Sequence, residues 1–166
     1  NEFSNKDILD VLKRIFNQCK GGYAVVALIS GIGLVAFRDP NGIRPLALGK
    51  NHNGSYLFAS ESSAITSLGF EVLKDVKPGE AIIINLDGSI EEKHLIKDMQ
   101  HTPCLFEYVY FSRPDSTIDS ISVHKSRLRM GDYLGEKIAT QYSHLNIDVV
   151  IPVPDTSRTA AMQVAH

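Results

Sequence analysis

The stretch GGYAVVALISGIGLVAFRD, residues 21–39, decides the fold class of this chain. It holds two short runs, residues 23–29 and 34–38, that are rich in apolar, β-branched and aromatic residues, as strands are. The residues between them, SGIG, are turn formers, so we predict an antiparallel hairpin. GIG lacks the third glycine of a dinucleotide fingerprint and precedes a strand rather than a helix, which argues against nucleotide binding at this turn.

The residues that follow extend the hairpin into an antiparallel meander. LALGK (46–50) and SYLFAS (55–60) are further strand-like runs, separated by the turn-forming NHNG. ESSAITSLG (61–69) predicts a short helix capped by Ser60 and ended by Gly69. KPGEAIIINLDGSIEEKHL (77–95) predicts a second hairpin with Asp87 and Gly88 at its tip.

The segment that precedes the meander, FSNKDILDVLKRIFNQCKGG (3–22), has the pattern of an amphipathic helix. Ser4 can cap its first turn, Asp7 can bond back to Ser4, and Phe3 and Ile8 have the spacing of a hydrophobic staple. We expect Cys19, on the apolar face, to be a small core residue rather than a reactive thiol. The helix and the strands together predict one layered α+β unit. The residues on the apolar face are Ile8, Leu12, Ile15, Phe16 and Cys19.

The pattern changes after the polar segment NLDGSIEEKHLIKDMQHTP (85–103), which is typical of a domain edge or linker. CLFEYVYFSRPDS (104–116) is aromatic and ends in a Pro-Asp-Ser turn, and residues 122–144 predict a helix. LNIDVVIPVP (145–154) predicts a strand, apolar on both faces at 148–153, of the kind that parallel sheets bury. A further helix begins near residue 158, so this region predicts the opening of an α/β unit. One face of the helix at 122–144 carries Val123, Met130, Leu134 and Ile138.

Composition excludes several classes of protein. Of the 166 residues, 43% are hydrophobic, and 17 basic residues nearly balance 19 acidic ones, so neither nucleic acid nor an anionic membrane surface is favoured as a partner. The longest apolar run, residues 23–29, is far shorter than the roughly 20 residues that cross a bilayer. Two distant cysteines and no secretory signal indicate a reducing cytoplasm. Asn1 stands where an initiator Met would be, so we expect the chain to begin inside a longer one.

The motif PDTSR (154–158) is the first candidate site. It follows the predicted buried strand and opens a helix, where free N–H groups attract anions. Thr156 or Ser157 can hold a phosphate or a phosphate-bound Mg²⁺, and Asp155 can orient a metal-bound water. The alternative is N-capping by Thr156 or Ser157 without any ligand, and spacing alone favours it.

The motif RDPNGIRPL (38–46) is the second candidate. Its arginines can clamp a substrate carboxylate. Turn chemistry at 39–42, with the arginines bonded to carbonyls or to Asp39, explains the same residues, and we favour this structural role. The six histidines have no zinc-site spacing, and no G-x-S-x-G motif or local cysteine-histidine arrangement is present. We therefore predict no catalytic nucleophile in these 166 residues.

Six stretches in order carry a family resemblance: GGYAVVALI, VAFRDPNGIRPLALGK, FASES, LGFEVLKDVKPGEAIII, CLFEYVYFSRPDS and DVVIPVPDTS. Together they resemble the amidophosphoribosyltransferase family, the glutamine phosphoribosylpyrophosphate amidotransferases. The resemblance implies a glutaminase domain of the Ntn-hydrolase fold, a class II glutamine amidotransferase, followed by a type I phosphoribosyltransferase domain. Residues 1–100 resemble the back half of the first, 101–145 the connection, and 146–166 the first strand and helix of the second.

The resemblance also implies an activity. Ammonia from glutamine displaces pyrophosphate from phosphoribosyl pyrophosphate and gives 5-phosphoribosylamine, the first step of purine (IMP) synthesis. The family's nucleophilic cysteine, its glutamine-binding arginine and its Asn-Gly oxyanion pair have no counterpart here, since Asn41-Gly42 is a scaffold turn. The double-aspartate motif and phosphate loop of the transferase site are missing as well. We therefore expect this segment alone to be inactive. The second hypothesis is a non-catalytic scaffold or anion-binding module.

The resemblance assigns ligands and partners residue by residue. It places Asp155, Thr156 and Ser157 at pyrophosphate and Thr156 at Mg²⁺, which reverses the preference for plain capping. Cys104 stands where one branch of the family has the first ligand of a [4Fe-4S] cluster, but a cluster needs about four thiolates, so we favour the cluster-free branch. The expected parent is a cytoplasmic homo-oligomer, inhibited by purine nucleotides, whose substrates are glutamine and phosphoribosyl pyrophosphate.

Overall fold

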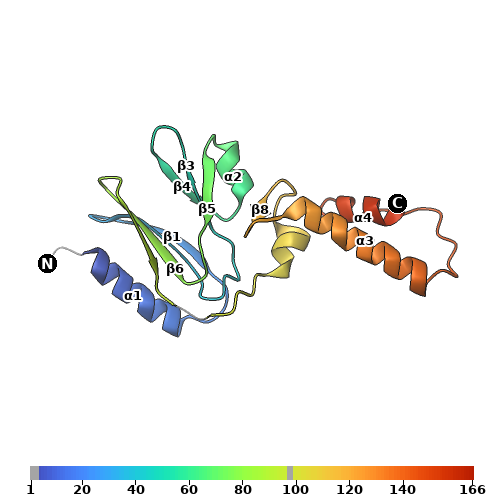
Figure 1. The fold of residues 1–166 in the computed structure, drawn as a ribbon, viewed down its shortest axis with the longest axis horizontal. Coiled ribbons are helices and arrows are strands. Elements are labelled where there is room, and N and C mark those ends of the chain that lie inside the picture. Colours follow the sequence, from blue (N-terminus) through green and yellow to red (C-terminus); the bar gives the residue numbers. More distant parts are fainter. Residues whose placement is uncertain (1–3, 97–98) are drawn as a thin grey trace. The chain divides into compact units, whose positions relative to one another are not determined.

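The computed structural model describes residues 4–96 and 99–166, which form two compact units, Asn1–Cys104 and Leu105–His166 (Figure 1). The first unit contains two antiparallel sheets, ordered β1-β2-β6-β7 and β4-β3-β5. Its elements are α1 (Asn5–Gln18), β1 (Ala24–Ile29), β2 (Gly33–Arg38), β3 (Ala47–Lys50), β4 (Tyr56–Ala59), α2 (Ser62–Ser67), β5 (Glu71–Asp75), β6 (Glu80–Asn85) and β7 (Ile90–His94).

The first unit is built in four layers, α1, the four-stranded sheet, the three-stranded sheet and α2. The apolar face of α1, with Leu12 and Phe16, packs on Phe37 and Ile83 of the four-stranded sheet. The opposite face of that sheet packs against the three-stranded sheet. Helix α2 contacts β3, β4 and β5, and Ile65 lies against Gly49, where a Cβ would come within 2.3 Å of the Ile65 side chain. Because strand residues alternate between faces, each sheet can bury both sides.

The structure confirms both predicted hairpins. Strands β1 and β2 pair through the turn SGIG, with Ile29 opposite Gly33. Strands β6 and β7 pair through a turn that contains Asp87 and Gly88, where the Gly88 N–H donates to the Asn85 carbonyl at 2.9 Å. Strands β3 and β4 pair around the NHNG loop. The α+β class and the antiparallel sheets are therefore as predicted.

The N-terminal helix begins as its sequence predicts. The Ser4 side chain accepts from the Asp7 N–H, and the Asp7 carboxylate accepts from the Ser4 N–H at 2.9 Å, which completes a capping box. The hydrogen bond from Ser4 holds the pKa of Asp7 below its ordinary value. The staple residue Phe3 lies outside the described residues.

Two local predictions in the first unit are wrong. Cys19 is exposed rather than in the core, because α1 ends at Gln18 and the extended backbone of Cys19 takes its side chain off the apolar face. Ser60 does not cap α2, which begins after Glu61 without a side-chain cap hydrogen bond. Both errors concern a helix end, where the last turn of a periodic pattern does not show which residue leaves the helix.

The second unit contains η1 (Glu107–Phe111, a π-helix), β8 (Thr117–Ile118), β9 (Ile121–Ser122), α3 (Val123–Gln141) and α4 (Arg158–Ala165). Strands β8 and β9 form a two-stranded hairpin, and Tyr108, Ile118 and Val123 form a small core. Helices α3 and α4 pack closely because Gly131 has no side chain, and a Cβ there would lie 2.5 Å from the Ala160 carbonyl oxygen.

The predicted strand at 148–153 does not form. The segment is extended without ladder partners, and Val149, Ile151 and Val153 are 70–80% exposed. A single strand leaves its N–H and C=O groups unpaired, and the described residues offer no neighbouring strand to pair with it. Apolar pattern alone therefore gave the wrong local structure here.

The division into units falls after Cys104. The amides of Thr102 and Cys104 donate to the carbonyls of Asn41 and Ile43, which attaches this segment to the first unit. Residues 105–145 and 146–166 share the second unit. The assignment of 1–100, 101–145 and 146–166 to a glutaminase domain, a connection and a transferase domain stays a prediction.

Tyr23 in the first core predicts a pH dependence of stability. Its hydroxyl is buried without a hydrogen-bond partner among the described residues, and burial, with smaller effects of Cys19 and Asp39, raises its pKa to about 12. Above the ordinary pKa of about 10 the unfolded state loses this proton and the folded state keeps it, so stability falls as pH rises from about 10 to 12. Tyr23→Phe should remove this part of the fall and should not destabilise the protein at pH 7.

Urea unfolding midpoints measured at several pH values check this expectation. The exposed Tyr142 provides the control, since Tyr142→Phe should leave the pH profile unchanged. A Tyr23→Phe profile identical to that of the unsubstituted chain above pH 10 would contradict it.

Candidate functional site

The PDTSR motif follows the extended segment 147–153, and its last residue, Arg158, is the first residue of α4. Three of its side chains already have partners within the chain. The Asp155 carboxylate forms an ion pair with Arg158, with 2.6 Å between Oδ1 and Nη2, and both side chains are at least 70% exposed. The Ser157 hydroxyl donates to the Val153 carbonyl oxygen. Thr156 forms no side-chain hydrogen bond with the residues that the structure describes. Three oxygen-bearing side chains thus stand in sequence before α4, and of these the Thr156 hydroxyl is the one without a partner among the described residues.

The capping alternative does not hold for α4. Ser157 occupies the N-cap position, but no side chain makes a cap hydrogen bond there. Among the described residues, no side chain accepts from the N–H groups of the first turn, although the Arg158 N–H donates to the Asp155 carbonyl at 3.3 Å. The structure brings Asp155, Thr156 and Ser157 together, as their adjacency requires.

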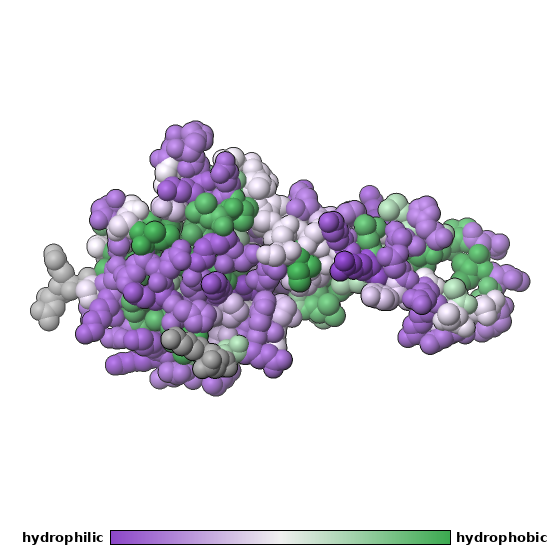
Figure 2. All heavy atoms as spheres, in the orientation of Figure 1, coloured by the Kyte–Doolittle hydropathy of each residue, from purple (hydrophilic) through white to green (hydrophobic). Residues whose placement is uncertain are grey.

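A cavity of about 640 Å³ adjoins this motif in the second unit. It is mainly apolar, and Figure 2 shows hydrophobic side chains around a hollow near the end of this unit. Because its walls are mainly apolar, the cavity suits an apolar chain segment better than a charged ligand, which would lose its hydration there. Its walls include Leu134 and Ile138 of α3, Val150 of the extended segment, and Ala161 and Val164 of α4.

The donor chemistry separates the two predicted metal centres. Hydroxyl and carboxylate oxygens, as at Thr156 and Asp155, are ligands that Mg²⁺ accepts. Cys104 is half-buried, and the chain has only two cysteines, so its own thiolates do not suffice for a [4Fe-4S] cluster. Within residues 4–96 and 99–166, no three His, Cys, Asp or Glu side chains are grouped as metal ligands. The motif therefore fits part of a magnesium site, and Cys104 alone does not fit a cluster.

At Arg38 and Asp39, the RDPNGIRPL motif has the structural role that we favoured from sequence. The buried Arg38 donates to three carbonyl oxygens, those of Gly42, Arg44 and Val76, at 2.6–2.9 Å. A guanidinium bonded in this way is not exposed to clamp a substrate carboxylate. The buried Asp39 carboxylate accepts from the backbone N–H groups of Tyr23, Asn41, Ile43 and Arg44 at 3.0–3.3 Å.

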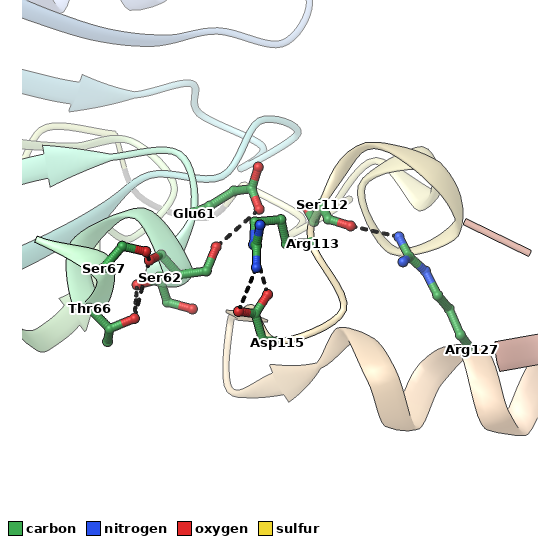
Figure 3. Close-up of polar contacts among 9 residues, drawn as sticks. Glu61, Ser62, Thr66, Ser67, Ser112, Arg113, Asp115 and Arg127 are labelled. Carbon is green, nitrogen blue, oxygen red and sulfur yellow. Dashed lines mark hydrogen bonds and ion pairs between the residues drawn. The ribbon is translucent and has the colours of Figure 1, made fainter. Parts of the chain in front are cut away.

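A second buried arginine holds the aromatic motif, and sequence reasoning missed it. Arg127 of α3 donates from Nε to the Tyr108 carbonyl at 2.8 Å. Its Nη2 donates to the Ser112 carbonyl at 2.7 Å, and Figure 3 draws this second bond. Within the same motif, Arg113 forms an exposed ion pair with Asp115, with 3.0 Å between Nε and Oδ1. The available signal was position, because Arg127 lies one turn after the buried Val123 on the same helical face.

Arg127→Met should lower the free energy of unfolding of the second unit by about 2–3 kcal/mol, because buried carbonyl groups lose charge-assisted donors. Hydrogen exchange of the amides at 107–112 measures this loss. Arg129→Met is the control, since Arg129 is exposed on the same helix. Equal exchange rates in the two variants would contradict the role assigned to Arg127.

No helix among residues 4–96 and 99–166 is long and apolar enough to cross a membrane.

Comparison with known proteins defines the class first. Residues 4–67 match the family model described as a glutamine amidotransferase domain, so this part of the chain resembles that class.

Relatives similar over nearly the whole chain point to one member of the class. The Pseudomonas aeruginosa amidophosphoribosyltransferase is 49% identical over 166 residues, covering 98% of this chain and 33% of the relative. The Escherichia coli protein is 54% identical over 151 residues, covering 89% and 30%. The Saccharomyces cerevisiae protein is 46% identical over 170 residues, covering 98% and 33%.

Solved structures agree with the sequence comparison. The B. subtilis glutamine phosphoribosylpyrophosphate amidotransferase, solved with ADP and GMP, has a TM-score of 0.82 and 37% identity, covering 99% of this chain and 34% of that one. The chain thus corresponds to a segment of amidophosphoribosyltransferases, and the resemblance seen in its motifs is confirmed. It spans about a third of the length of the curated relatives it matches.

Proposed function

We propose that the chain is part of an amidophosphoribosyltransferase, which makes 5-phosphoribosylamine from phosphoribosyl pyrophosphate and glutamine in the first step of purine synthesis. The observation that carries this proposal is identity of 46–54% to relatives of that name across 89–98% of the chain. Agreement in fold with the B. subtilis enzyme supports it.

The proposal assigns residues 1–100 to a glutaminase domain of the Ntn-hydrolase fold and residues 146–166 to the start of a type I phosphoribosyltransferase domain. The layered first unit and its match to a glutamine amidotransferase model support the first assignment. For the second, the support is a helix, an apolar extended segment and a further helix in the order of an α/β unit. In that unit, residues 148–153 would pair with neighbouring strands and lose their exposure.

In the proposed transferase site, Thr156 supplies a hydroxyl oxygen to Mg²⁺, and Asp155 and Ser157 contact pyrophosphate or its bound water. The uncapped N-terminus of α4 contributes backbone N–H groups toward the same negative charge. Mg²⁺ would neutralise charge on the pyrophosphate leaving group. Asp155 must leave its ion pair with Arg158 to take part, which both exposed side chains permit.

The proposed regulators, location and assembly follow from the relatives. The B. subtilis enzyme was solved with ADP and GMP, and a second neighbour, with a TM-score of 0.81, is described as the allosteric regulatory enzyme of purine biosynthesis. These names support purine nucleotides as feedback inhibitors of the proposed enzyme. We further propose a cytoplasmic homo-oligomer, without nucleic acid or membrane partners.

A chimera tests the proposal. The chain would replace the matching segment of the Escherichia coli amidophosphoribosyltransferase, to which it is 54% identical, in a strain that lacks its own enzyme. We expect growth without added purines and glutamine-dependent formation of phosphoribosylamine. Thr156→Val in the chimera should lower the transferase reaction while glutamine hydrolysis persists, and Thr140→Val, in α3, is the matched control. A folded chimera without either activity would overturn the proposal.

The chain by itself should be inactive. We expect no detectable glutamine hydrolysis by the 166 residues, because they offer no nucleophile of the proposed kind. Calorimetry with phosphoribosyl pyrophosphate and Mg²⁺ distinguishes the alternative, an autonomous anion-binding module. Tight binding that Thr156→Val abolishes would favour the module, whereas weak or absent binding fits one part of a larger transferase site.

A further inference from the structure

The chain contains two Asn-Gly pairs that no function uses, Asn41-Gly42 and Asn53-Gly54. In such a pair the backbone nitrogen of glycine can reach the side-chain amide carbon of asparagine, because glycine carries no Cβ to obstruct the approach. Attack of the glycine nitrogen on this amide carbon requires a mobile asparagine side chain and a backbone that can bend. The same chemistry is therefore present twice, in two different surroundings.

Asn53 belongs to the loop between β3 and β4. Figure 1 shows this loop at the edge of the first unit, and Figure 2 shows that it is polar. Residues 52–55 are exposed, and the Asn53 side chain makes no hydrogen bond with any residue that the structure describes. The base of the loop is held by Asn51, whose N–H donates to the Ser55 carbonyl at 3.0 Å and whose Oδ1 accepts from the Ser55 N–H at 2.8 Å. The tip can thus rearrange while the hairpin remains paired.

Asn41 is restrained where Asn53 is not. Its Nδ2 donates to the Gln100 carbonyl and its backbone N–H donates to Asp39 Oδ1, both at 3.0 Å. Gly42 is buried, and a Cβ there would lie 2.7 Å from the Pro78 side chain and 2.9 Å from His101. The backbone N–H of each glycine donates one backbone hydrogen bond, Gly42 to the Asp39 carbonyl and Gly54 to the Asn51 carbonyl. The two sites therefore differ in the restraint of the asparagine side chain and in packing, not in the hydrogen bonding of the glycine N–H.

We propose that Asn53 is a site of spontaneous deamidation and that Asn41 is protected from it. The Gly54 nitrogen gives up its proton and attacks the Asn53 Cγ, a C–N bond forms, and the side-chain nitrogen leaves as ammonia. The resulting succinimide takes up one water and opens to aspartate or isoaspartate. Water is the sole co-reactant, and no electrons are transferred.

The modification changes the loop chemically and does not depend on the proposed function. Each event adds one negative charge to a chain whose formal net charge is −2. The isoaspartate product also inserts a methylene group into the backbone of the β3–β4 loop. The strands outside this loop should remain paired because Asn51 holds its base.

Peptide mapping by mass spectrometry after incubation of the folded chain at mildly alkaline pH tests the proposal. We expect the mass change of amide-to-acid conversion at Asn53 at least about tenfold faster than at Asn41, which corresponds to about 1.4 kcal/mol of opening free energy. In denaturant both sites should react at similar rates. Asn53→Ser should remove the major modified species. Equal rates at both sites in the folded chain, or an Asn53 that reacts only in denaturant, would overturn the proposal.

Discussion

Replacement of Asp39 by alanine should lower the free energy of unfolding of the first unit by about 3–5 kcal/mol. The Asp39 carboxylate is fully buried and accepts four backbone N–H bonds, three from the loop that joins β2 to β3 and one from Tyr23, just before β1. Alanine would leave those donors without an acceptor inside the protein, and a buried donor that loses its partner costs more than the hydrogen bond contributed.

Urea unfolding, with hydrogen exchange of the β1 and β2 amides as the readout, measures the loss in free energy of unfolding caused by Asp39→Ala. Asp87→Ala is the matched control, because Asp87 accepts from the Ser89 N–H and hydroxyl at the exposed tip of the β6–β7 hairpin. We expect only a small change there, since water replaces the lost bonds. Asp39→Asn should fall between the two, because one carbonyl oxygen remains to accept. An Asp39→Ala variant as stable as Asp87→Ala would refute the role of this carboxylate.

Gly33→Ala should be comparably destabilising, by about 3–5 kcal/mol, through strain added to a steric clash. The φ of Gly33 is +129°, a conformation that residues with a Cβ rarely adopt, and a Cβ there would lie 2.1 Å from the Ile84 carbonyl oxygen. That oxygen is backbone of the neighbouring strand β6, so no side-chain rotation relieves the contact.

Gly31→Ala separates the two causes at the Gly33 site. Gly31 lies in the same turn with a φ of +79°, but no described atom lies within 4 Å of a Cβ built there. Gly31→Ala should lower the free energy of unfolding by only about 1–2 kcal/mol, the cost of a left-handed backbone for alanine. Thermal or urea unfolding of both variants gives the comparison. Similar losses would show that the clash with β6 is absorbed and that backbone strain alone matters.

The parts of the fold that were predictable rest on contacts between residues close in sequence. The capping box of Ser4 and Asp7, the SGIG turn and the Asp87-Gly88 turn each need only a few neighbouring residues, and the structure has all three. The turn chemistry of RDPNGIRPL likewise predicted arginines bonded to carbonyls or to Asp39, and the structure has the first of these at Arg38.

The parts that were not predictable depend on partners far along the chain. Arg127 is buried because the carbonyls of Tyr108 in η1 and of Ser112 just after it, 19 and 15 residues earlier, lie within reach of its guanidinium. A helical pattern shows an arginine on an apolar face but not the acceptors that satisfy it. The candidate site has the same limit, because adjacency brings Asp155, Thr156 and Ser157 together, while other groups of a magnesium site must come from elsewhere in the fold.

The sequence by itself determined the α+β class, the hairpins and the family resemblance, because turns, caps and motifs are read from residues a few positions apart. Only the tertiary structure decided that Cys19 faces solvent and that residues 148–153 are not a strand. A run that is apolar on both faces shows only that a segment can be buried in a sheet. A strand exists only where a neighbouring backbone accepts and donates its hydrogen bonds, and that neighbour is a property of the whole fold.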